Sequence, residues 1–227
     1  MYDPDEDINR FLAQQVGWSW FDDHLLYTCG VVELLRTGRL KQLPPRPTRV
    51  RLERGELPLA EGPAVWWEWR AIGDGSWDHN RIAATGSLGF VAAAHLGNAA
   101  LNHARRRRAE QAMQPRWVAD PPATALISDQ RMYFINPRQS WSMHWSGLDQ
   151  LDLLGPDRVG FKYVLDDGTQ AMVQVQCPWA ALVFTIAAHG HFPHHPTLLS
   201  GAWLPEGFEE KCHLAGKSCP KVRHPPR

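Results

Sequence analysis

The sequence predicts an α+β fold in which an antiparallel sheet or open barrel is capped by a C-terminal helix. Six short runs rich in strand-forming residues follow one another with turn residues between them: TALISDQ, RMYFINP, SWSMHWS, LDQLDLL, VGFKYVL and TQAMVQV. The apolar run PWAALVFTIAAHG comes directly after them. Consecutive short strands predict antiparallel pairing, and a single terminal helix can cover the apolar mouth of such a sheet.

The composition narrows the class of protein. The chain has 227 residues, of which 44% are hydrophobic, enough to bury one core and a small appended subdomain. Lys plus Arg and Asp plus Glu number 24 each, so no overall charge attracts nucleic acid or an anionic membrane. The chain begins MYDPDEDINRF, which is acidic where a secretory signal is basic and then apolar. We therefore expect a cytoplasmic protein whose four cysteines are reduced.

The first part of the chain, residues 1–48, predicts a helical cap followed by a linker. Apolar residues recur at helical spacing between Asp3 and about Leu40, and we expect two helices there. The run PPRPTR follows, and clustered prolines end a helix and stiffen the connection. The linker is expected to end near Arg49.

The second part, residues 49–190, is expected to hold the sheet and one long helical insertion. Val65, Trp67 and Trp69 alternate with neighbours that face the other way, as a half-buried first strand requires. The insertion lies at about residues 80–114. Because it is rich in alanine and free of proline from Ile82 to Met113, it predicts one long helix or a helical hairpin.

The apolar first part of this insertion has two interpretations. Because arginines follow it, the segment is typical of a membrane span with a positive flank. However, polar residues such as His95 and Asn98 interrupt the apolar run, and burying them in a membrane is energetically unfavourable. We favour a helix that packs closely on another helix or on a second subunit through small residues. The candidate interface residues are Gly86, Gly89, Phe90, Ala93 and Gly97.

Four consecutive arginines, Arg105, Arg106, Arg107 and Arg108, lie toward the end of the insertion. Successive helical residues are about 100° apart, so the four side chains fan over roughly 300° and do not share one face. This is typical of a solvated helix end, where cations also suit the helix dipole. Binding to an anionic lipid surface or a polyphosphate is the alternative, and nucleic acid is less favoured.

Turn residues separate the strands of the predicted sheet. Asp129 tolerates turn conformations, and Asp167 followed by Gly168 is a strong signal for a tight hairpin. The helix after the last strand has apolar residues at helical spacing, so one of its faces is expected to cover the sheet. That face consists of Ala180, Val183, Phe184 and Ala187.

The run Leu126–Phe134, LISDQRMYF, resembles a hairpin of bacterial, actinobacterial-type pleckstrin-homology-like and GRAM-like domains. In that family the hairpin reads leucine, two variable residues, threonine or aspartate, a variable residue, arginine, leucine, a variable residue and phenylalanine. A tryptophan-bearing strand, two more strands, an Asp-Gly turn, a last strand and a helix beginning at a proline follow in the same order here. The resemblance covers about Val65–Gly190 and implies a pleckstrin-homology-like sheet or open barrel. The basic residues of eukaryotic phosphoinositide readers have no clear equivalent in the first strand-to-strand loop.

The eleven tryptophans of the chain occur in clusters. Large aromatic side chains fill the core and the cross-strand positions of a small sheet. A platform for single-stranded nucleic acid would need basic residues between the aromatic ones, and the run WSMHW lacks them. We therefore expect the tryptophans to lie in the core.

The third part, residues 191–227, is rich in proline, histidine and cysteine and is expected to be irregular and partly mobile. Zinc is bound by these residue types, but the cysteines are farther apart in sequence than paired zinc cysteines usually are. A disulfide between them is not expected in a reducing cytosol. No cofactor is therefore expected, with zinc as the alternative. Its candidate ligands are His191, His194, His195, Cys212 and Cys219.

Familiar catalytic motifs are absent: the chain has no Gly-rich phosphate loop, no zinc-protease helix motif and no Gly-x-Ser-x-Gly elbow. Asp22 and Asp23 beside His24 resemble an acid and a base, but adjacent carboxylates on an amphipathic helix are more typical of a solvated face. We therefore expect a non-enzymatic binding or assembly module that acts through contacts with a protein partner or with itself. Peripheral binding to an anionic membrane surface is the alternative, and a zinc-dependent role comes third.

Overall fold

The computed structural model describes residues 11–44, 46–72, 103, 105–136, 140–165 and 167–223. Its helices and strands are α2 (Trp20–Arg36), η1 (Leu40–Gln42), β1 (Pro58–Arg70), β2 (Arg116–Ala119), β3 (Ala123–Ser128), β4 (Arg131–Ile135), β5 (Ser140–His144), η2 (Trp145–Gly147), β6 (Gln150–Gly155), β7 (Arg158–Val164), β8 (Gln170–Gln176), α4 (Ala180–His191), α5 (Pro196–Leu199) and α6 (Phe208–Leu214). Residues 11–15 and 105–112 are also helical.

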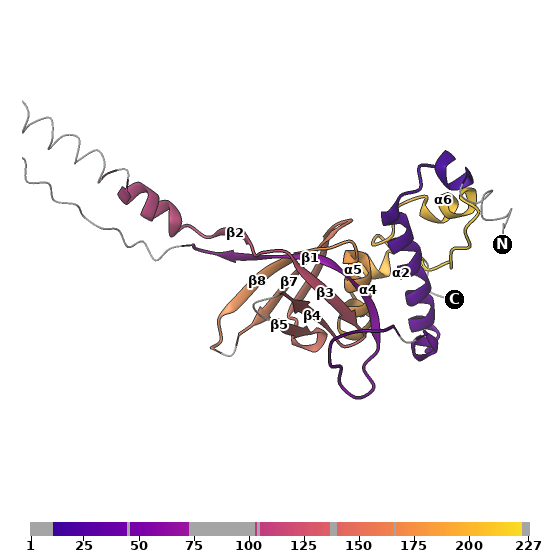
Figure 1. Ribbon diagram of the computed structural model, residues 1–227, viewed down its shortest axis with the longest axis horizontal. Helices are drawn as coiled ribbons and strands as arrows, with labels where there is room; N and C mark the ends of the chain where they lie inside the picture. The colour runs from indigo at the N-terminus through magenta and orange to yellow at the C-terminus, as the bar shows by residue number, and fades with distance from the viewer. Residues whose placement is uncertain are drawn as a thin grey trace, which may run out of the picture. The chain divides into compact units, whose positions relative to one another are not determined.

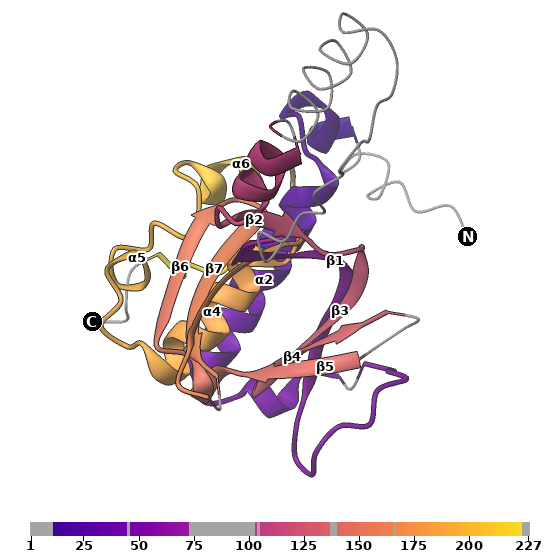
Figure 2. The ribbon, with the colours of Figure 1, turned by 90° about the vertical axis from the view of Figure 1, so that its left-hand side faces the viewer.

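An eight-stranded sheet forms the frame of the protein (Figure 1). The strand order is β5-β4-β3-β1-β8-β7-β6, and β2 pairs with β1 off this path. The pairs β1–β3, β3–β4, β4–β5, β6–β7 and β7–β8 are antiparallel. Within the described residues β5 and β6 are not paired with each other, so the sheet is open. In Figure 2 the strands β3, β4 and β5 lie on one side of the sheet and β6 and β7 on the other. The predicted α+β class and antiparallel sheet are confirmed.

The strands agree closely with the sequence pattern. The six predicted runs correspond to β3, β4, β5, β6, β7 and β8, and the predicted helix corresponds to α4. The turn at Asp167 and Gly168 is also present, with Gly168 at φ +82°, a conformation that favours glycine. The first strand begins at Pro58, earlier than Val65. The short strand β2 was not predicted, because RWVA has too few residues to show a period.

The chain divides into two compact units. One consists of residues 1–67 and 120–227, and the other of residues 68–119. The sequence-based boundaries at residues 48 and 190 do not coincide with these units. Within the second unit, the rings of Trp69 and Trp117 meet edge to face with centroids 5.4 Å apart. The backbone N–H of Ile72 also donates to the carbonyl of Ala112 at 3.0 Å.

Most of the predicted helical insertion lies outside the described residues, including Gly86, Gly89, Phe90, Ala93 and Gly97. Its last part is helical, as expected. Among the helices that the structure describes, none combines the length and the apolar character that crossing a membrane requires.

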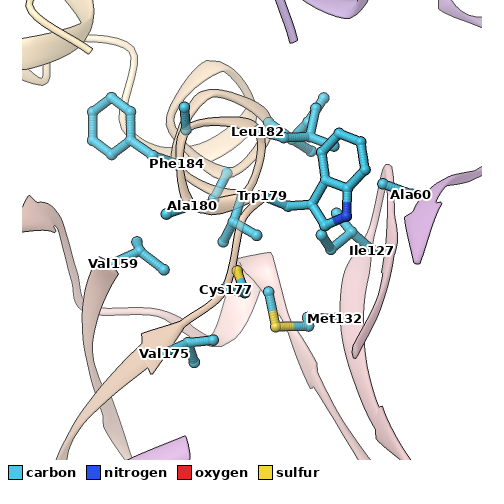
Figure 3. Packing of buried hydrophobic residues seen from close by; sticks show 14 of the residues in the cluster. Ala60, Ile127, Met132, Val159, Val175, Cys177, Trp179, Ala180, Leu182 and Phe184 are labelled. Carbon is cyan, nitrogen blue, oxygen red and sulfur yellow. The ribbon is translucent and has the colours of Figure 1, made fainter. Parts of the chain in front are cut away.

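Helix α4 is buried on all sides. Every residue from Ala180 to Ala188 is at most 4% exposed. The helix contacts β6 and β7 of the sheet, and it also contacts η2 and α2. Figure 3 shows Leu182 and Phe184 projecting to opposite sides of the helix. The residues of the face predicted to cover the sheet are all buried, and burial extends to the rest of the helix because α2 also packs on it.

The C-terminal part is folded rather than irregular. It contains α5 and α6, and Trp203, Phe208 and Val222 are at most 3% exposed. The guanidinium of Arg36 in α2 donates to the carbonyl of Val222 at 2.5 Å. The expectation of an irregular tail was therefore wrong for α5 and α6. The residues around them lack regular secondary structure, but Trp203 and Val222 among them are buried in the core.

The tryptophans are divided between core and surface. Trp66, Trp145, Trp179 and Trp203 are at most 9% exposed, and Trp145 also donates its ring N–H to the carbonyl of Ser128 at 3.2 Å. In contrast, Trp20 is 65% exposed. The core prediction is thus confirmed for the first four. It is wrong for Trp20, whose ring packs against its helical neighbours Phe21 and His24, and for Trp69, which is 43% exposed.

Asp22 has a structural role at the start of α2. Its carboxylate accepts hydrogen bonds from the backbone and the hydroxyl of Ser19, both at 2.7 Å, in a capping box. It also accepts from the ammonium of Lys211 in α6 at 2.9 Å. Asp22 is 6% exposed, so the prediction that it lies on a solvated face was wrong. Burial disfavours its charged form, but the hydrogen bonds from Lys211 and Ser19 outweigh burial and hold its pKa below the ordinary value.

Replacing Asp22 should therefore destabilise the fold. We expect Asp22→Asn to lower the free energy of unfolding by about 1–2 kcal/mol through the lost cap and charge-assisted bonds. Asp23→Asn is the matched control, because Asp23 is exposed and forms a 3.4 Å ion pair with Lys217 that should contribute less than about 0.5 kcal/mol.

The effect of Asp22→Asn should depend on pH. The depressed pKa means that the stabilisation is present above the unfolded value of 3.8 and is lost as the pH falls through the folded value. Urea denaturation of both chains at several pH values measures this. The difference should stay constant near neutral pH and shrink in acid, and a difference that grew in acid would contradict the assignment.

Candidate functional site

A buried polar network joins the β3–β4 hairpin to the loop before β1. At its centre the carboxylate of Glu56, whose side chain is 0% exposed, accepts from the hydroxyls of Ser128 at 2.5 Å and Tyr133 at 2.8 Å. The guanidinium of Arg131, 8% exposed, pairs with Glu56 at 3.4 Å and with Glu53. The Nε and Nη2 groups of Arg131 lie close enough to the two carboxylates to form ion pairs, but their N–H groups do not point at the carboxylate oxygens as hydrogen bonds require. The network therefore depends on charge as well as on direct bonds.

The ionisation of this network follows from its contacts. Burial disfavours the carboxylate of Glu56, but hydrogen bonds from Ser128, the Glu53 backbone and Tyr133 outweigh it and lower its pKa. Burial and the hydrogen bond to the Glu56 carboxylate raise the pKa of Tyr133 to about 12. Glu56 is thus held charged and Tyr133 protonated at neutral pH.

The hairpin motif LISDQRMYF has a physical explanation in these contacts. The carboxylate of Asp129 accepts from the backbone of Leu57 at 2.8 Å, and Leu57 in turn accepts from the backbone of Asp129 at 3.1 Å. Arg131 supplies the cation that offsets the charge of Glu56. The aspartate and the arginine of the motif therefore fasten the hairpin to the preceding loop, and neither is free to bind a ligand.

A groove of about 410 Å³ lies next to this network, on β4 and β5. The strand register places Tyr133 opposite Ser142 and Ile135 opposite Ser140, and residues directly opposite each other share one face of a sheet. The residues that line the groove are Arg49, Val50, Tyr133, Phe134, Ile135, Ser140, Trp141 and Ser142. Along β4 and β5, Phe134 lies between Tyr133 and Ile135, and Trp141 lies between Ser140 and Ser142. The rings of Phe134 and Trp141 stack on each other with centroids 4.3 Å apart.

The groove combines a cation, hydroxyls and apolar walls. Arg49 is exposed, and within the described residues it makes no ion pair or hydrogen bond. Val50 and Ile135 supply apolar surface, and Ser140 and Ser142 supply hydroxyl groups. Such a surface suits a ligand that has a negative group beside an apolar one.

The groove also lies at an edge of the sheet. β5 is the last strand of the order, and its outer side is unpaired among the described residues. Its sequence, SWSMH, has none of the lysine, glutamate or proline residues that discourage a further strand from pairing with an edge. The edge is therefore open to strand addition.

None of the residues predicted to form sites is among those that line the groove. All four of Arg105, Arg106, Arg107 and Arg108 are exposed, and Arg106 pairs with Glu110 at 2.9 Å. The prediction that they form a solvated helix end is consistent with this exposure. Sequence reasoning missed the groove, because Arg49 stands in the proline-rich linker and its neighbours in the groove come from strands far along the chain.

The predicted zinc ligands do not form one group. His191 and His194 are exposed. Both ring nitrogens of His195 are engaged, one with the carbonyl of Leu151 at 2.9 Å and the other with the backbone N–H of Thr197 at 3.2 Å. Cys212 and Cys219 lie together, but with Cys29 and not with these histidines. In the part of the chain that the structure describes, no three such side chains are placed to hold a metal ion.

Glu56 should contribute far more to stability than Glu53, although both pair with Arg131. We expect Glu56→Gln to lower the free energy of unfolding by about 3 kcal/mol, because it leaves the buried guanidinium without its buried partner. Glu53→Gln is the matched control: that side chain is 62% exposed, and its loss should cost less than about 1 kcal/mol. Urea denaturation measures both, and equal losses would show that burial of the pair does not decide its effect.

No protein-family model, curated protein or solved structure matches this chain. The chemistry of the groove and the order of the strands are therefore the observations that bear on function.

Proposed function

We propose that this chain is a non-enzymatic binding module with a pleckstrin-homology-like scaffold, and that it binds an extended, acidic segment of a partner protein along β5. The observation that carries the proposal is the unpaired cation Arg49 in a groove beside an open sheet edge. The scaffold assignment is supported by the order of strands and closing helix along the chain, which is the order that the resemblance implies.

The edge and the groove would supply different parts of the binding energy. An added strand gains main-chain hydrogen bonds from β5, whatever its sequence, while pockets for alternate side chains give specificity. An acidic side chain of the segment would meet Arg49 and the hydroxyls of Ser140 and Ser142. An apolar side chain would lie on Val50 and Ile135.

The proposal predicts a selective loss of binding on reversing the charge of Arg49. A synthetic peptide array that varies the position of acidic and apolar residues provides the ligands, and fluorescence anisotropy measures their affinity. We expect Arg49→Glu to weaken binding of the acidic peptides about tenfold or more, because attraction becomes repulsion. Arg51→Glu is the matched control, since Arg51 is equally exposed, has the same charge and does not line the groove.

A second variant tests the groove itself. Ser142→Trp would fill the groove beside β5 and should remove binding of all selected peptides while the circular dichroism spectrum is unchanged. The proposal fails if no peptide binds the wild-type chain, or if Arg51→Glu weakens binding as much as Arg49→Glu does.

Binding to an anionic lipid surface is the second candidate function, favoured by the four exposed guanidinium groups of Arg105, Arg106, Arg107 and Arg108. Each basic residue near such a surface contributes about 1 kcal/mol. Flotation with vesicles that contain phosphatidylserine should then be lost when all four are replaced with glutamine, and it should be retained in Glu110→Gln. Equal flotation with neutral vesicles would argue against this function.

A further inference from the structure

The second compact unit, residues 68–119, is basic, although the chain as a whole is neutral. Its sequence contains seven arginines, no lysine and four acidic residues, which gives a net charge of +3. The rest of the chain has 17 basic and 20 acidic residues and therefore a net charge of −3. Such an asymmetry between two parts of a chain is typical of proteins whose basic part meets an anionic partner.

The same unit exposes three large apolar side chains: Trp69 is 43% exposed, Ile72 57% and Met113 49%. The ring of Trp69 packs edge to face on the ring of Trp117, with centroids 5.4 Å apart. The backbone N–H of Ile72 donates to the carbonyl of Ala112, the residue before Met113, at 3.0 Å. These two contacts hold the end of β1 against the segment between the helix of residues 105–112 and β2. We call Trp69, Ile72 and Met113 the apolar patch.

Arginines surround the apolar patch. Arg70 and Arg116 stand beside the two tryptophans in the sequence, and both are exposed. The helix that carries the run of four arginines ends at Ala112, where Ile72 is bonded. Arg108 is four residues from Ala112, which is about 6 Å along the helix axis. Because the four side chains fan around the helix, some of them reach a flat surface that touches the patch, whichever way the helix lies.

The acidic side chains of this unit do not oppose an anionic partner. In the part of the unit that the structure describes, there are two acidic residues, and each is paired with an arginine. Glu68 pairs with Arg70 at 3.0 Å, and Glu110 pairs with Arg106 at 2.9 Å. The positive charge of the unit is therefore not offset by an unpaired carboxylate beside the patch.

An anionic membrane surface is the partner that fits both the charge and the apolar side chains. Tryptophan is suited to the headgroup level of a membrane, where its ring meets apolar chains and its N–H meets water. Arginines nearby attract anionic headgroups. Single-stranded nucleic acid would use tryptophan and arginine, but it would gain little from an exposed isoleucine and methionine. The composition of the patch therefore favours lipid.

We propose that the unit of residues 68–119 docks on an anionic membrane surface, with Trp69, Ile72 and Met113 inserted at the headgroup level and its arginines on the lipid phosphates. Binding of this kind gains from the apolar area that is buried as well as from the charges. The inference rests on the second candidate function, lipid binding, and it is independent of the groove beside β5. It adds the apolar side chains that enter the membrane.

Flotation of the full chain with vesicles of phosphatidylcholine and phosphatidylserine tests the apolar patch. We expect Ile72→Ser and Met113→Ser each to weaken partitioning about threefold or more, and Trp69→Ala about fivefold or more, because less apolar area is buried. Leu199→Ser and Trp20→Ala are the matched controls. Their side chains are 58% and 65% exposed but belong to the other unit, so partitioning should be unchanged. The two serine variants do not touch the Trp69 ring contact, and circular dichroism checks that every variant is folded.

Salt separates insertion from attraction between charges. At about 0.5 M salt the arginines are screened, whereas buried apolar area still holds the chain on the membrane. We therefore expect the wild-type chain to keep part of its flotation at high salt, and the three patch variants to lose it.

The outcomes distinguish this inference from lipid binding itself. If the patch variants float as well as the wild-type chain, while replacement of the four arginines with glutamine removes flotation, the inference fails and lipid binding by charge stands. If the wild-type chain does not float with anionic vesicles, both fail. Binding of single-stranded RNA in place of vesicles, or equal losses in the two controls, would also overturn the inference.

Discussion

Helix α4 is buried on every side, and the other elements of the fold are arranged so that they cover it. Its residues from Ala180 to Ala188 are apolar except for Thr185, whose hydroxyl bonds within the helix to the carbonyl of Ala181 at 2.8 Å. A sheet can cover only one side of such a helix, so other elements must cover the remainder. Helix α2 and the C-terminal segment do so. That requirement explains why a proline-rich segment is ordered and why Asp22 meets Lys211.

Two polar features lie side by side on the β3–β5 part of the sheet, and they differ in kind. The network around Glu56 is buried, and each charge in it has a partner, as a stable interior requires. Arg49 in the adjacent groove is exposed, and within the described residues it has no partner. Tyr133 belongs to both features, because it lines the groove and donates to Glu56. The network therefore fastens the hairpin that forms one wall of the groove.

The sequence pattern was sufficient for most of the sheet. Each strand from β3 to β8 is long enough to show its alternation, and turn residues such as Asp167 and Gly168 mark its ends. The pattern was insufficient for β2, which has four residues, and for the C-terminal segment, whose prolines concealed the apolar residues Trp203 and Phe208. The pattern also placed Asp22 on a solvated face, because the sequence does not show that a distant residue, Lys211, pairs with this aspartate. In each case a contact with a distant segment decided the outcome.

The fold class, the order of the strands, the position of the closing helix and the hairpin turns could all be predicted from the amino-acid sequence. These depend on periodicity and turn chemistry, which are local properties. Packing between distant segments, in contrast, covers α4 with α2 as well as with the sheet, pairs Arg131 with Glu56 and brings Arg49 into the same groove as Ser142. The physical reason is that periodicity specifies which face of an element is apolar, whereas the segment that covers this face is selected by packing between residues far apart in the chain.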